Sequence, residues 1–84
     1  MTGPTRYLHE DPTPKTVVFC DEFIDIKKMA EEEGFNYTYL SHVFSAHSPK
    51  FPAHRVGQQI ALALGMEYGD FVDALLLKKG RSIA

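Results

Sequence analysis

The chain has 84 residues, of which 44% are hydrophobic and 24% are charged, and its formal net charge is −2. This length allows one small domain with a single core, and the composition is that of a folded chain. No apolar run approaches the roughly 20 residues that cross a bilayer, and the N-terminus lacks the charged-then-apolar order of a signal peptide. We therefore expect a cytoplasmic protein without a membrane segment.

The sequence offers little chemistry for catalysis or metal binding. Its one cysteine, Cys20, excludes an internal disulfide framework and is weak as a nucleophile without a positioned histidine. A glycine-rich phosphate loop is also missing from the sequence. His42, His47 and His54 are spaced by five and seven residues, which does not place them on one helical face as a zinc site would require. We expect no enzyme activity, no metal and no cofactor.

The first twenty residues contain few helix signals. Residues 1–14 include Pro4, Pro12 and Pro14 and show no sustained apolar periodicity, so we interpret them as an extended or disordered N-terminal arm. Residues 16–20, Thr-Val-Val-Phe-Cys, are β-branched and aromatic. Five residues do not distinguish a short strand at 16–19 from the start of a first helix, and both alternatives stay open.

Residues 15–80 are expected to form the folded domain, and its centre is a pair of short helices. The first helix follows Asp21, the expected N-cap, and ends at Gly34, which suits the positive φ of a helix stop. Its apolar stripe comprises Phe23, Ile24, Ile26 and Met29. Asn36 is suited to cap a second helix, in which Leu40 and Val43 share one face and point back at the first. This is the layout of a helix-turn-helix.

Two further helices follow a loop that contains Pro49 and Pro52. The earlier one ends at Gly65 and has apolar residues at helical spacing, namely Val56, Ile60, Ala61 and Leu64. The last one stops at Gly80 and repeats the spacing with Phe71, Val72, Leu75 and Leu76. Lys78 and Lys79 lie near its C-terminal end, where the helix dipole favours cations. Residues 81–84 are expected to be frayed.

Acidic residues are absent from Asn36 to Met66 although the net charge is negative. The cationic or titratable residues of this stretch are His42, His47, Lys50, His54 and Arg55. Since the distribution of charge matters more than its sum for binding an anion, we expect one face of the domain to be basic and suited to phosphates.

Two separated segments are similar to a known family. Met29-Ala30, Gly34, Phe35, Asn36 and Tyr39-Leu40-Ser41 resemble the helix-turn-helix of the phage repressor and Cro family of transcriptional regulators. The likeness continues in Ile60 to Met66, followed by Tyr68, Asp70, Phe71 and Val72, which resemble the family's fourth helix, glycine stop and fifth helix. It covers residues 24–77. The resemblance implies a mainly α, compact domain of four to five helices that binds double-stranded DNA.

The resemblance also implies which residues contact DNA, because only the N-terminal and outward residues of a recognition helix reach base edges in the major groove. The implied base contacts are Asn36, Tyr37, Thr38, Ser41 and His42. The implied phosphate contacts are Ser45, His47, Lys50, His54 and Arg55. Tyr39 stands at a position that packs inward in the family, so we expect it in the core.

A single recognition helix covers few base pairs, so useful affinity needs two half-sites and a two-fold dimer. Leu75, Leu76 and Leu77 on the last helix are the candidate dimer interface, and a strand at Val17–Phe19 pairing across the two-fold axis is the rival. The sequence thus predicts a sequence-specific DNA-binding regulator, a repressor that acts as a homodimer. The alternative is a protein-interaction module of the same fold, such as an antirepressor or a subunit of a larger regulator.

Overall fold

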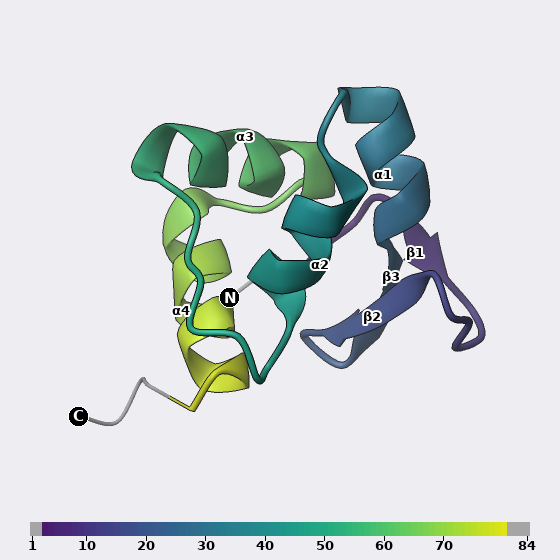
Figure 1. The fold of residues 1–84 in the computed structure, drawn as a ribbon, viewed down its shortest axis with the longest axis horizontal. Helices are drawn as coiled ribbons and strands as arrows, with labels where there is room; N and C mark the ends of the chain where they lie inside the picture. The colour runs from purple at the N-terminus through teal and green to yellow at the C-terminus, as the bar shows by residue number, and fades with distance from the viewer. Residues whose placement is uncertain (1–2, 81–84) are drawn as a thin grey trace.

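The computed structural model of the protein describes residues 3–80, which form a small sheet and four helices. The elements, in chain order, are β1 (Leu8–His9), β2 (Thr16–Phe19), β3 (Glu22–Asp25), α1 (Ile26–Glu33), α2 (Tyr37–Phe44), α3 (His54–Leu64) and α4 (Tyr68–Lys78). The antiparallel sheet and α1 lie on one side of α2, and α3 and α4 lie on the other (Figure 1). None of the helices within these residues is long and apolar enough to cross a membrane.

The sheet corrects the expectation of a mainly α fold. The strand alternative for residues 16–19 is confirmed, but this strand is one of three over residues 3–80. It pairs with β3, which pairs with β1 on its other side, so the order is β1-β3-β2. Ile24 of the central strand pairs with Leu8 on one side and with Val17 on the other. The stripe that includes Phe23 and Ile24 suggested a helix because a four-residue strand is too short to show its own period. The domain is therefore a mixture of helix and sheet.

A tight hairpin replaces the expected helix start at Asp21. Phe19 pairs with Glu22, which leaves Cys20 and Asp21 as a two-residue loop with φ values of 54° and 62°. Positive φ at both loop positions is the geometry of a type I′ turn, whose twist matches that of the flanking strands. The prediction that Asp21 caps the first helix is therefore wrong. Asp25 caps α1 instead, and its Oδ1 accepts a hydrogen bond of 2.9 Å from the Lys28 backbone N–H.

The N-terminal segment packs against the domain. Pro4 is buried, and the backbone N–H groups of Thr5 and Arg6 donate to the Leu64 carbonyl at 2.8 and 3.2 Å. Gly65, which ends α3 at a φ of 77°, accommodates this approach, because a Cβ there would lie 2.2 Å from the Thr5 Oγ1. Much of the segment for which an extended or disordered arm was predicted, residues 1–14, thus lies against α3 and β3. Residues 1–2 and the predicted frayed end, residues 81–84, lie outside the described residues.

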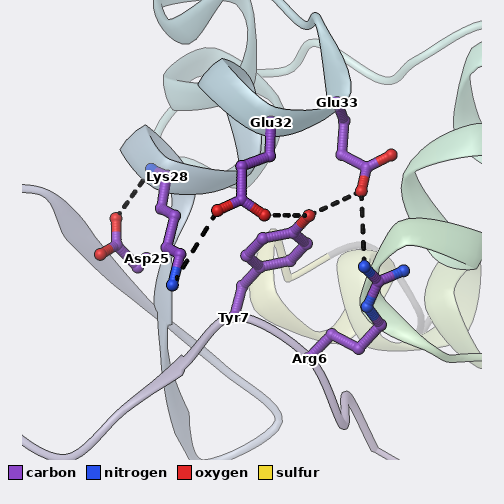
Figure 2. A network of polar contacts seen from close by, with 6 residues as sticks. All are labelled: Arg6, Tyr7, Asp25, Lys28, Glu32 and Glu33. Carbon is purple, nitrogen blue, oxygen red and sulfur yellow. Dashed lines mark hydrogen bonds and ion pairs between the residues drawn. The ribbon is translucent and has the colours of Figure 1, made fainter.

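A polar network ties this segment to the end of α1 (Figure 2). The Tyr7 hydroxyl donates to Glu33 Oε2 at 2.6 Å and to Glu32 Oε1 at 3.2 Å. Arg6 Nη2 lies 3.7 Å from Glu33 Oε2, and Lys28 Nζ lies 4.0 Å from Glu32 Oε2. These partners offset the unfavourable position of acidic side chains at a helix C-terminus, where the dipole repels them.

The hydrophobic core joins the sheet to the helices through three phenylalanine rings. Phe19 of β2 lies 5.1 Å from Phe44 of α2 and 5.8 Å from Phe71 of α4, measured between ring centroids. Phe44 and Phe71 are 6.1 Å apart and meet edge to face, an arrangement that aromatic quadrupoles favour. Each ring is at most 1% exposed. The core thus depends on elements that are distant in the sequence.

We predict that Phe44→Ala lowers the free energy of unfolding by about 3–5 kcal/mol, because it removes a buried ring and leaves a cavity between β2 and α4. This is a large part of the stability of a small domain, which is typically about 5–15 kcal/mol. Urea unfolding followed by circular dichroism measures the change. The control is Leu62→Ala, at a side chain that is 76% exposed, for which we expect a change within about 0.5 kcal/mol.

The Tyr7 network predicts a stability change at alkaline pH. The hydrogen bond to Glu33, followed by desolvation and the charges of Glu33 and Glu32, raises the pKa of Tyr7 from 10.0 to about 12. A tyrosine with a raised pKa in the folded state stabilises the fold below pH 10, and this contribution is lost as the pH rises toward 12. The stability difference between the natural chain and Tyr7→Phe should therefore shrink over that interval. A constant difference from pH 8 to pH 12 would contradict the assignment.

Candidate nucleic-acid interface

The pair α1 and α2 is fixed by caps at each end of the turn between them. Gly34 has a φ of 78°, and both its N–H and that of Phe35 donate to the Ala30 carbonyl at 3.0 Å. Asn36 Oδ1 accepts a hydrogen bond of 2.9 Å from the Tyr39 N–H. The predicted glycine stop and asparagine cap are therefore confirmed, and α2 leaves α1 after a three-residue connection over residues 34–36.

The outward face of α2 is polar and carries no carboxylate. Leu40, Val43 and Phe44 are fully buried, and helical periodicity places Thr38 and His42 on the opposite side, where both are exposed. Ser41 and Ser45 flank them and are half-buried. Ser41 Oγ also donates to the Tyr37 carbonyl at 3.0 Å, a local bond that leaves its lone pairs available. The face therefore presents short hydroxyl side chains and an imidazole.

A lysine and a tyrosine stand on each side of this face. Lys27 Nζ, from the first turn of α1, lies 5.2 Å from the ring centroid of Tyr37. Lys50 Nζ, from the loop after α2, lies 5.0 Å from the ring centroid of Tyr39. Since successive helical residues are about 100° apart, the two tyrosines project on either side of Thr38. The polar face of α2 is thus flanked by one ammonium group on each side.

Sequence reasoning missed Lys27 as a site residue because it belongs to a different helix. Its sequence neighbours place it on the outer surface of α1, and only the packing of α1 against α2 brings it to Tyr37. Lys27 also pairs with Glu31 at 3.8 Å, a solvent-exposed pair one helical turn apart. Such surface pairs contribute little, about 0–1 kcal/mol, so the ammonium group can exchange Glu31 for another anion at little cost.

The loop after α2 is held by Lys79, the C-cap of α4. Lys79 Nζ donates to the carbonyls of Ser45 and Ser48 at 2.7 and 2.8 Å and lies 3.4 Å from the carbonyl of His42. These acceptors include carbonyls at the C-terminal end of α2, where the helix dipole favours a cation. The sequence suggested only that Lys79 complements the dipole of its own helix. Its actual position fixes the loop that carries His47 and Lys50, both exposed.

The other predicted phosphate residues lie at the start of α3. Arg55 is exposed. The His54 ring packs edge to face on Tyr68 of α4, with centroids 4.6 Å apart, so it belongs to the α3–α4 contact and not to α2. In Figure 1 the first turn of α3 lies at the end of that helix farther from α1. Lys27 and Lys50 therefore contact tyrosines of α2, whereas His54 contacts a tyrosine of α4.

Neither a reactive thiol at Cys20 nor a metal site built from acidic side chains is indicated within residues 3–80. Burial, and then the charges of Asp21 and Asp70, raise the pKa of the Cys20 thiol, which lowers the fraction of reactive thiolate. Within residues 3–80, no group of three or more His, Cys, Asp or Glu side chains is arranged to hold a metal ion.

The leucines predicted for the dimer interface have different environments. Leu75 is fully buried in the core of its own chain, Leu76 is half-buried and Leu77 is 63% exposed. In the rival strand, Val18 is 51% exposed and Phe19 is 1% exposed. Leu77 and Val18 are therefore the residues of each candidate interface that are accessible to a partner.

Comparison with models of known protein families gives no match to this chain, and no curated protein or solved structure matches it.

The cap at Asn36 gives a test of its role. We predict that Asn36→Ala lowers the free energy of unfolding by about 1 kcal/mol, because the Tyr39 N–H loses its acceptor, whereas Asn36→Asp retains the acceptor and the stability. Thermal unfolding of the two variants measures the difference. Equal stability of all three proteins would show that the cap contributes nothing.

Proposed function

We propose that the protein is a sequence-specific, double-stranded DNA-binding regulator in which α1, the turn at Gly34 and α2 act as a helix-turn-helix. In this proposal α2 enters the major groove and the protein represses by occupying an operator. The likeness of residues 24–77 to the phage repressor and Cro family supports this assignment, as do the glycine stop and the asparagine cap on either side of the short turn.

One observation carries the proposal: the polar face of α2, which has no carboxylate, lies between the Lys27–Tyr37 pair and the Lys50–Tyr39 pair. A major groove about 12 Å wide admits one helix and has a phosphate backbone along each edge. A helix seated there needs donors and acceptors facing the bases and a cation toward each backbone. The face of α2 and its two flanking lysines provide this combination.

The individual side chains suit base edges at short range. The Thr38 hydroxyl can donate or accept, and the Ser41 hydroxyl, which donates to the Tyr37 carbonyl, can accept. The methyl group of Thr38 is suited to contact that of thymine. His42 is suited to donate to a guanine or to a phosphate. Since α2 has no arginine or glutamine for bidentate contacts, we expect modest discrimination per base pair, and Asn36 is occupied as the cap of α2.

The net charge of −2 favours a second candidate function, a protein-interaction module of the same fold, because negative charge opposes binding to phosphates. The two functions differ in their response to salt. DNA binding releases condensed counterions, so affinity falls steeply as salt rises. An interaction module would show no binding to random duplex DNA even at low salt.

We predict that fluorescence anisotropy with random duplex DNA shows binding whose log affinity falls linearly with log salt concentration. Lys27→Ala and Lys50→Ala should each reduce that slope by about 0.9 and weaken all sequences alike, because each removes one phosphate contact. Lys15→Ala is the matched control, since this exposed lysine lies in the loop between β1 and β2.

Selection from a random DNA library separates base contacts from phosphate contacts. Thr38→Ala and His42→Ala should change the selected sequence, whereas Lys50→Ala should retain it. The proposal fails if the natural chain does not bind at low salt, or if Lys15→Ala changes the slope as much as Lys27→Ala does.

A further inference from the structure

An apolar hollow of about 500 Å³ lies between the β2–β3 hairpin and one face of α4. Val18 and Leu77 both line it, and they are 51% and 63% exposed. Ala74 and Met66 add to its apolar lining. Single exposed leucines are ordinary, but two large apolar side chains beside one hollow form a patch whose burial would be favourable. The last helix and the strand at residues 17–19, which the sequence suggested as rival interfaces, therefore border one surface.

The face of α4 that borders the hollow has a symmetric order of charges. Asp70, Ala74 and Lys78 all line the hollow and follow one another at intervals of four residues, so they share one side of the helix. An acid and a cation thus lie about 12 Å apart along the axis, with a small residue midway between them. If two copies of α4 lie antiparallel with Ala74 at the two-fold axis, Asp70 of each copy comes opposite Lys78 of the other. The face is complementary to itself.

We propose that this surface binds a second copy of the chain, with α4 packed antiparallel to α4 and Leu77 of each copy entering the hollow of the other. A two-fold contact of this kind makes every interaction twice. The small side chain of Ala74 allows the two helix axes to approach closely at the centre. The contact involves neither the polar face of α2 nor its flanking lysines, so it does not depend on DNA binding.

The position of Lys78 favours helix packing over strand pairing. Lys78 Nζ donates to the Val18 carbonyl at the open edge of β2. A lysine that covers an edge carbonyl obstructs the addition of another strand there. The ammonium group has three donors, so it can keep this bond and still pair with Asp70 of the second copy. Because the Lys78 side chain is already held at the hollow, its pairing across the interface costs less conformational entropy.

Sedimentation equilibrium of the full chain without DNA tests this proposal. We expect a reversible dimer, and we expect Leu77→Ser to weaken it by about tenfold or more, because burial of the same side chain is lost twice. Leu62→Ser is the matched control: this leucine lies on α3, is 76% exposed and does not line the hollow, and its substitution should leave the dimer unchanged. A monomeric natural chain, or equal effects of the two substitutions, would overturn the proposal.

Charge reversal tests the antiparallel register. Asp70→Lys alone and Lys78→Glu alone should each give monomers, because each sets like charges opposite one another. Mixing these two variants should restore a dimer, since the two introduced side chains then face each other with opposite charges, and the unchanged Lys78 of one chain faces the unchanged Asp70 of the other. Circular dichroism verifies that each variant is folded. If either is unfolded, the comparison of Leu77→Ser with Leu62→Ser tests the interface in its place. A mixture of folded variants that stays monomeric would overturn the antiparallel register. Failure of the natural chain to bind DNA would contradict the proposed function but not the dimer.

Discussion

The contact among Phe19, Phe44 and Phe71 is the constraint on which the other features depend. The rings come from β2, α2 and α4, and their mutual burial joins a sheet near the N-terminus to a helix near the C-terminus. A chain of this length has room for a single core, so most elements must contribute to it. This packing buries the inner face of α2, so its polar side faces the solvent. The candidate interface is therefore a consequence of how the core is filled.

Charged side chains then fix the parts that the core does not reach. Arg6 and Tyr7 hold the N-terminal segment to the acidic end of α1. Lys79 holds the end of α2 and the loop that follows it, and Lys78 holds the edge of β2. Adjacent lysines at the end of α4 thus bind backbone carbonyls of two different elements. Burial lowers the pKa of Lys78, in keeping with its position over the sheet edge.

The proposed functions use separate surfaces of the domain. The DNA-binding proposal uses the polar side of α2 with Lys27 and Lys50, whereas the dimer proposal uses α4 and the hairpin. The net negative charge opposes the first proposal, but the acidic side chains of α1 are paired locally, because Glu31, Glu32 and Glu33 each lie close to a cation, from α1 itself or from Arg6. A repressor that reads a two-fold operator would need both surfaces at once.

Local signals in the sequence determined the helix ends, because a cap or a positive φ depends on one or two residues. Gly34, Asn36 and Gly65 act as their types predict, and the inward positions of α2 follow from periodicity alone. The sequence also offered the strand at residues 16–19 as an alternative. It did not indicate β1 or β3, since strands of two and four residues are defined by their pairing partners rather than by their own pattern. Only the tertiary structure placed Lys27 beside Tyr37 and Lys79 beneath α2, because such contacts arise when helices pack, and side chains distant in sequence then meet.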